Sequence, residues 1–178
     1  MEIKVLYDNQ WIQLKEMSDP SQDVNGYVFS HEKRCDGKIV TILPFRKTEN
    51  GIEYLLRKEV TPCWSMTPVV SSITGGVENN DPTLTATHEL KEEGGYNVPP
   101  SELIPLTTMY GTKSSDTIYY LFTVDLTGKI QGDAPGDGSE MEKKARCYWT
   151  KDIIQAKDPF VYALYVHIQN MRVGSKKV

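Results

Sequence analysis

The stretch TGGVENNDPTLTATHELKEEGGY, residues 74–96, decides how the rest of the chain is interpreted. It contains one helix whose two ends follow from the residues alone. Asp81 is a favourable N-cap, Pro82 suits the first helical position, and Gly94-Gly95 provide a stop. The pattern therefore predicts a helix over residues 82–93, preceded by a short glycine-containing loop.

Three glutamates share one face of this helix, because Glu89, Glu92 and Glu93 stand at i, i+3 and i+4. Like charges about 6 Å apart repel by roughly 3 kcal/mol at an effective dielectric of about 20. The helix dipole disfavours negative charge at this C-terminal end as well. A divalent cation would relieve the repulsion, since Mg²⁺ prefers carboxylate and phosphate oxygens. A solvated acidic patch is the alternative explanation.

The composition is that of a soluble globular protein. We expect one domain over residues 1–178, with residues 1–30 as an amino-terminal β extension. With 39% hydrophobic and 25% charged residues, the chain is neither disordered nor fibrous. The net charge of −4 argues against nucleic acid as a partner, and the sequence has no apolar run long enough for a membrane helix.

The cysteines and histidines are scattered. Cys35, Cys63 and Cys147 have no C-x-x-C spacing, which argues against a disulfide framework and favours a reducing, cytoplasmic compartment. The three histidines lie far apart in the sequence. A bound metal is therefore expected to have oxygen ligands.

Strand signals flank the helix on both sides. Runs rich in β-branched and aromatic residues predict strands at residues 2–6, 11–16, 26–30, 38–43, 52–58, 69–73, 106–109, 117–125 and 145–150. The nearly apolar run 38–43 is expected to be central in a sheet, and 52–58 to pair in a hairpin across a turn at 47–51. A second helix is predicted to begin at Asp158-Pro159. The expected fold class is α/β, or more strictly α+β, with helices packed on a mixed sheet.

The segment resembles the signature of the Nudix hydrolases, G-x5-E-x7-R-E-U-x-E-E-x-G-U, in which U is a bulky apolar residue. The residues in register are Glu89, Leu90, Glu92, Glu93, Gly95 and Tyr96, and Gly75-Gly76 precede the helix. The resemblance implies an α/β/α sandwich. It also implies Mg²⁺- or Mn²⁺-dependent hydrolysis of a pyrophosphate bond in a nucleoside diphosphate linked to another moiety, such as ADP-ribose or a nucleotide sugar.

The resemblance further implies roles for individual residues. The expected metal ligands are Glu89, Glu92, Glu93 and the carbonyl of Gly75. Glu93 is also expected to be catalytic, and Glu140 or Glu142 would serve as a further ligand or as the base for the attacking water, with Glu140 the first choice. The expected substrate-binding residues are Arg57 and Lys58, for phosphate, and Tyr110, for stacking on a base.

Two positions depart from the signature. His88 stands where the family has an arginine that braces the metal-binding carboxylates, and we expect it to do so only in part or only when protonated. The earlier glutamate of the signature falls on Asn80, and the loop after Gly76 is two residues shorter. Glu78 and Asp81 are both candidates for the missing acid.

Several functions are therefore to be compared. The favoured one is a pyrophosphohydrolase with a small nucleotide substrate. The alternatives are a catalytically reduced nucleotide-binding or sensor module, a dinucleoside polyphosphate hydrolase, and a structural subunit with an acidic patch. A homodimer is compatible with the sequence, because strands within residues 2–16 can pair across a two-fold axis.

Overall fold

The structure is a computed structural model that describes residues 1–136, 138 and 142–174, with Glu142 and residues 172–174 described as backbone only. Its strands are β1 (Glu2–Asp8), β2 (Ile12–Asp19), β3 (Val24–Glu32), β4 (Lys38–Ile42), β5 (Phe45–Thr48), β6 (Gly51–Thr61), β7 (Ser65–Ser71), β8 (Ile73–Gly76), β9 (Ile104–Tyr110), β10 (Ile118–Thr123) and β11 (Arg146–Thr150). Its α-helices are α1 (Pro82–Glu92) and α2 (Pro159–Gly174). Among the described residues, no helix is long and apolar enough to cross a membrane.

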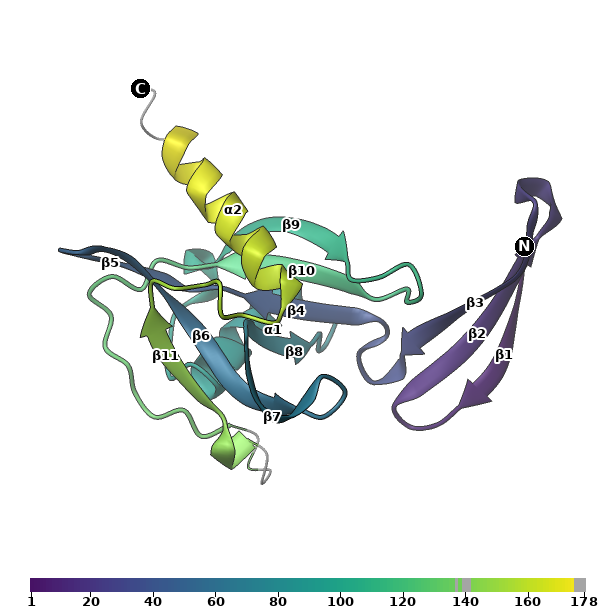
Figure 1. Cartoon of the computed structure of the whole chain (residues 1–178), viewed down its shortest axis with the longest axis horizontal. Coiled ribbons are helices and arrows are strands. Elements are labelled where there is room, and N and C mark those ends of the chain that lie inside the picture. The colour runs from purple at the N-terminus through teal and green to yellow at the C-terminus, as the bar shows by residue number, and fades with distance from the viewer. Residues whose placement is uncertain (137, 139–141, 175–178) are drawn as a thin grey trace.

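Two sheets form the body of the molecule (Figure 1). One has the order β8-β4-β10-β9, and the other has the order β11-β6-β5, with β7 also paired to β6. In the first sheet β4 runs parallel to β10 and antiparallel to β8, so it is the central strand that its apolar sequence predicted. The sheet is therefore mixed, as expected.

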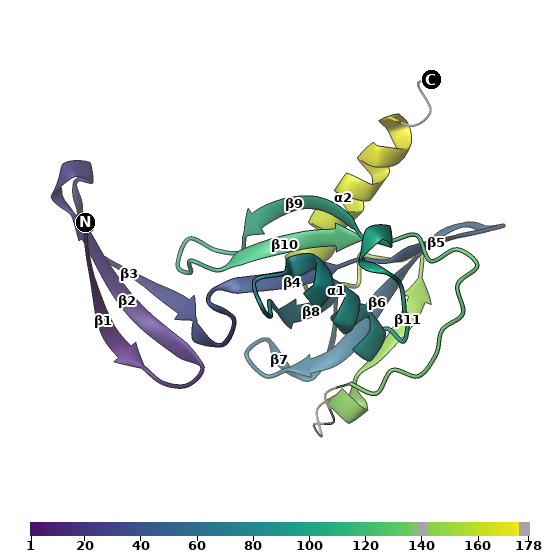
Figure 2. The same ribbon diagram turned by 180° about the vertical axis from the view of Figure 1, so that it is seen from behind.

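The two body sheets form one layer, and the helices α1 and α2 cover its opposite faces, as the views from the front and from behind show (Figures 1 and 2). Successive side chains of a strand point to opposite faces, and β6 illustrates the result. Leu55 packs in the core that contains Ala86 and Leu90 of α1, whereas Leu56 packs with Leu164 of α2. Alternate side chains of β6 therefore pack against α1 on one face and against α2 on the other.

Two predicted strands need correction. The hairpin partner of β6 is β5, which begins at Phe45 and was not expected as a separate strand. The run 69–73 is divided at Ser72, where the chain passes from the sheet of β7 to the sheet of β8. The backbone N–H of Ser72 donates to Asp158 Oδ2 at 3.0 Å, and its hydroxyl lies 2.7 Å from Thr41 Oγ1. Ser72 therefore binds side chains where a continuous strand would bind its neighbour.

The first three strands form a sheet of their own, with the order β1-β2-β3. This amino-terminal sheet projects away from the body in both views (Figures 1 and 2). Its connection to the loop before β10 includes the bonds from Ser30 N to Ser114 O, 2.9 Å, and from Asp116 N to Ser30 O, 3.2 Å. All seven residues of β1 are exposed.

Candidate active site

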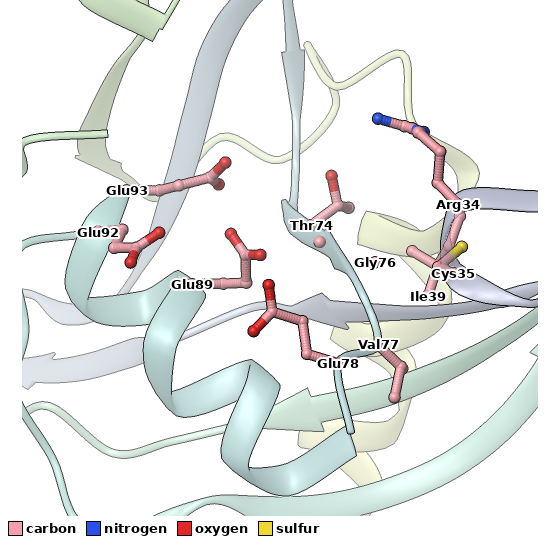
Figure 3. A pocket seen from close by; sticks show the side chains of 11 residues that line it. Arg34, Cys35, Ile39, Thr74, Gly76, Val77, Glu78, Glu89, Glu92 and Glu93 are labelled. Carbon is pink, nitrogen blue, oxygen red and sulfur yellow. The ribbon is translucent and has the colours of Figure 1, made fainter. Parts of the chain in front are cut away.

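A pocket of about 510 Å³ opens where the end of β8 meets α1. Its acidic lining residues are Glu78, Glu89, Glu92 and Glu93. Gly75 and Gly76 form the strand side, and Arg34 and Cys35 lie across from the helix (Figure 3). The three glutamates that share a helical face in the sequence thus line one cavity, together with a fourth from the preceding loop.

The boundaries of α1 follow the predicted signals. Asp81 Oδ1 accepts a hydrogen bond from Leu84 N at 3.0 Å, which is the expected N-cap contact. Ala86 and Leu90 are completely buried on the sheet side. At the other end, Gly95 adopts a left-handed conformation with φ 74°, which a glycine permits most easily. The helix is therefore anchored at both ends and its acidic face is directed to the pocket.

Gly75 and Glu89 approach each other very closely. A Cβ atom added to Gly75 would lie 1.8 Å from Glu89 Oε1 and 2.1 Å from its carboxyl carbon. The Glu89 carboxylate therefore occupies the space that a side chain at position 75 would fill. A side chain at position 75 would have to displace this carboxylate, so the glycine lets the strand backbone lie beside an expected metal ligand.

The structure distinguishes Glu78 from Asp81. Glu78 lines the pocket, and its backbone N–H donates to Thr85 Oγ1 of α1 at 3.0 Å. Figure 3 shows the Glu78 and Glu89 side chains pointing toward each other. Asp81 is occupied as the helix cap and is absent from the pocket lining. Of the two candidates for the missing acid, Glu78 lines the pocket and Asp81 does not, and the role of Glu78 stays a prediction.

Arg57 is almost completely buried, with 2% of its side chain exposed. Its Nε donates to Glu59 Oε2 at 2.7 Å, and its Nη1 lies 3.2 Å from Glu93 Oε2. It lines a second, smaller pocket beside Glu92 and Glu93. Phosphate binding by Arg57 stays a prediction, and it would require the guanidinium to turn from these carboxylates toward the substrate.

Three more residues were expected at the site, namely Lys58, Tyr110 and His88, and none of them lines either of these two pockets. Lys58 follows Arg57 along β6, so it faces the opposite side of the sheet, where it lines a groove with Trp64 and Lys157. Tyr110 is 67% exposed at the end of β9. His88 is exposed on α1 and does not line the pocket of the glutamates. Their expected roles in substrate binding and bracing stay predictions.

Residues 131–136, in the loop before β11, contact the end of α1. Gly136 N donates to Glu92 O at 3.0 Å, and Gln131 Nε2 donates to Gly94 O at 2.9 Å. Gly136 and Ala145 both line the smaller pocket with Glu92 and Glu93. Glu140 lies outside the described residues, as does the side chain of Glu142. Their expected roles stay predictions, although the described residues on both sides border the acidic face.

The cysteines near the site are not activated. Burial raises the pKa of Cys147, which lines the smaller pocket, to about 12. Burial also raises the pKa of Cys35 in the larger pocket. Because the thiolate is the reactive form, neither residue has the character of a nucleophile at neutral pH.

The donor set of the larger pocket is made of carboxylates, which suits a hard divalent cation with oxygen ligands. Within the described part of the chain, no three acidic, histidine or cysteine side chains are already close enough together to hold an ion. The chemistry of the lining fits the expected cation.

Comparisons with known proteins bear on the fold. No protein-family model matches the chain, and no curated protein sequence matches it. Among solved structures, the crystal structure of an ADP compounds hydrolase aligns with 100% of this chain and 95% of that chain, with a TM-score of 0.67 and 11% sequence identity. The expected α/β/α fold is confirmed by this similarity. At this identity the likeness concerns the fold alone.

Proposed function

We propose that the chain is a Mg²⁺- or Mn²⁺-dependent hydrolase that cleaves the pyrophosphate bond of a nucleoside diphosphate linked to another moiety. The observation that carries the proposal is the lining of one pocket by four glutamates from α1 and the loop before it. The fold shared with an ADP compounds hydrolase favours ADP-linked compounds such as ADP-ribose among such substrates.

In this proposal Glu89, Glu92 and Glu93 hold the cation together with the carbonyl of Gly75. The bound cation would neutralise phosphate charge and make water a stronger nucleophile. Water attacks one phosphorus, the bond from that phosphorus to the bridging oxygen breaks, and the bridging oxygen leaves with the other phosphate. Glu93, and Glu140 or Glu142 from the neighbouring loop, are the proposed acceptors of the proton from water.

The experiment is a substrate panel containing ADP-ribose, nucleotide sugars and dinucleoside polyphosphates, each incubated with Mg²⁺, with Mn²⁺, or with EDTA. Anion-exchange separation of the products identifies the bond that is cut. We expect two phosphate monoesters from ADP-ribose or a nucleotide sugar, formed only with metal. Faster cleavage of dinucleoside polyphosphates would shift the proposal to that substrate class. No cleavage of any compound would contradict it.

A nucleotide-binding or sensor module is the second candidate. One observation favours it: His88, at the arginine position of the signature, is exposed and absent from the pocket lining. Isothermal titration calorimetry with the same panel separates the two functions. Tight binding without product formation would favour the sensor.

As a partner we propose a second copy of the chain, bound through the amino-terminal sheet. Ile3 and Val5 lie two residues apart on β1, and Tyr27 of β3 is in register with Ile3 through Met17 of β2, so the three share one face of that sheet. Their exposed fractions are 49%, 49% and 45%. Apolar side chains gathered on one exposed face are typical of an interaction surface, and a two-fold axis would cover the same face on both copies.

A further inference from the structure

A chain of three charged residues, buried at its centre, connects β6 to the acidic end of α1. Arg57 stands between Glu59, whose Oε2 accepts from its Nε at 2.7 Å, and Glu93, whose Oε2 lies 3.2 Å from its Nη1. Glu93 exposes only 11% of its side chain, compared with 2% for Arg57. The interaction is therefore largely shielded from water. An ion pair in such surroundings is stronger than one at the surface.

Arg57 is fixed in the middle of its sheet. It pairs with Cys147 of β11 on one side and with Ser71 of β7 on the other. Glu59 is held as well, because the Ser71 hydroxyl donates to its Oε1 at 3.3 Å. The planar guanidinium presents its donors in fixed directions. Contact with Glu59 thus limits its rotation and directs Nη1 to Glu93.

The thiol of Cys147 does not compete for this guanidinium as an anion. Cys147 lies directly opposite Arg57 on the neighbouring strand, but burial raises the pKa of its thiol to about 12, so it is neutral at physiological pH. Among the described residues, the carboxylates of Glu59 and Glu93 are the anions that contact the guanidinium.

We propose that Arg57 is the positioning residue that directs Glu93 into the pocket, in the role expected of residue 88 from the sequence. The proposal rests on the hydrolase proposed above. Glu93 shares its helical face with Glu89 and Glu92, and their repulsion would turn its carboxylate away. The positive charge of Arg57 offsets this repulsion from the sheet side, and His88 on the helix surface is not required for it.

The test compares Arg57→Met, which keeps the length of the side chain without charge, and Arg57→Lys, which keeps the charge without the planar fork. Arg46→Met is the matched control, because Arg46 also pairs with a glutamate, Glu53, at 2.7 Å and lies outside both acidic pockets. Mn²⁺ affinity is measured by calorimetry without nucleotide. Residues that support metal ligands typically contribute roughly 10- to 100-fold to metal affinity. We expect a loss in this range for Arg57→Met, a smaller loss for Arg57→Lys, and none for Arg46→Met.

Steady-state kinetics separates positioning from substrate binding. A positioning role predicts a lower kcat with nearly unchanged KM for the nucleotide. A large rise in KM at unchanged Mn²⁺ affinity would mean that Arg57 grips phosphate directly, and would overturn the proposal.

A double-mutant cycle in thermal unfolding gives an answer that is independent of activity. Arg57→Met takes the guanidinium away from the carboxylates of both Glu59 and Glu93, so we expect a lower Tm, and adding Glu93→Gln should recover the part of the loss that belongs to Glu93. Glu93→Gln combined with Arg46→Met should be additive. If Arg57→Met does not fold, the cycle is run with Arg57→Lys. Additivity of Arg57 and Glu93 variants would overturn the proposal even in an active enzyme. If the wild type neither binds Mn²⁺ nor turns over, the proposed function fails, and this cycle alone decides whether Arg57 holds Glu93.

Discussion

The amino-terminal sheet and the sheet that contains β4 carry similar apolar side chains in very different surroundings. Val40 and Ile42 of β4 are completely buried, because they pack in the core that includes Leu90 of α1. In β1, Val5 and Tyr7 are 49% and 55% exposed. A strand pattern predicts pairing in both places, but among the described residues it is the body sheets that the two α-helices cover. We infer that the body carries the stability and the chemistry, while the amino-terminal sheet is suited to association.

The largest expected effect is on catalysis and belongs to the body alone. Glu93→Gln keeps the size of the side chain and removes one carboxylate of the pocket. We expect kcat to fall by at least about 1000-fold, equivalent to roughly 4 kcal/mol of activation free energy. Glu16→Gln in β2 is the control and should retain wild-type kcat. Wild-type turnover by Glu93→Gln would remove Glu93 from the proposed mechanism.

The next effect concerns the free energy of unfolding. Leu55 is completely buried in the core beneath α1, and its truncation leaves a cavity. We expect Leu55→Ala to cost about 2–5 kcal/mol, and Val5→Ala less than about 1 kcal/mol because its side chain is half exposed. Urea unfolding is measured at concentrations where the chain is monomeric. Equal losses would show that the amino-terminal sheet is as well covered as the body.

A smaller change in free energy should be visible in the assembly. Val5→Lys places a charge on the apolar face of the amino-terminal sheet and should shift the protein from dimer to monomer in light scattering. Met66→Lys is the control, because Met66 is 77% exposed on β7 of the body. A monomeric wild type, or a dimer unaffected by Val5→Lys, would contradict association through this sheet.

The smallest expected effect is a difference in reactivity between two cysteine thiols, Cys63 and Cys147. Cys63 is exposed, whereas burial raises the pKa of Cys147 to about 12. At pH 8 we expect iodoacetamide to label Cys63 first and Cys147 only after unfolding, as followed by mass spectrometry. Since the folded state keeps a proton that the unfolded state loses above about pH 8.5, stability from this thiol should decline as the pH rises beyond that value. Fast labelling of native Cys147 would contradict the raised pKa of its thiol.

Local signals explain how much of the fold could be predicted from the sequence. The cap at Asp81 and the glycines after Glu93 bound α1 correctly, because both depend on residues within one or two turns. The division at Ser72 could not be predicted, since it depends on Asp158, far along the chain. A hydrogen bond between residues so far apart in the chain cannot be recognised from the local pattern of apolar and polar residues.

The candidate site was predictable to a similar extent. Helical spacing places Glu89, Glu92 and Glu93 together, and the use of Asp81 as a cap could already have favoured Glu78. Strand alternation could also have shown that Arg57 and Lys58 face opposite sides of β6. The pairing of Arg57 with Glu93 joins a strand to a distant helix end, so only the folded structure reveals it.

The close approach at position 75 has an evolutionary consequence. Because a methyl group there would overlap the Glu89 carboxylate, replacement of Gly75 would force that acid out of its place. Selection for the acid is therefore also selection for the glycine. A chain that keeps both Gly75 and Glu89 can keep the proposed cation site, whereas one with a side chain at position 75 would have to give up this position of the acid.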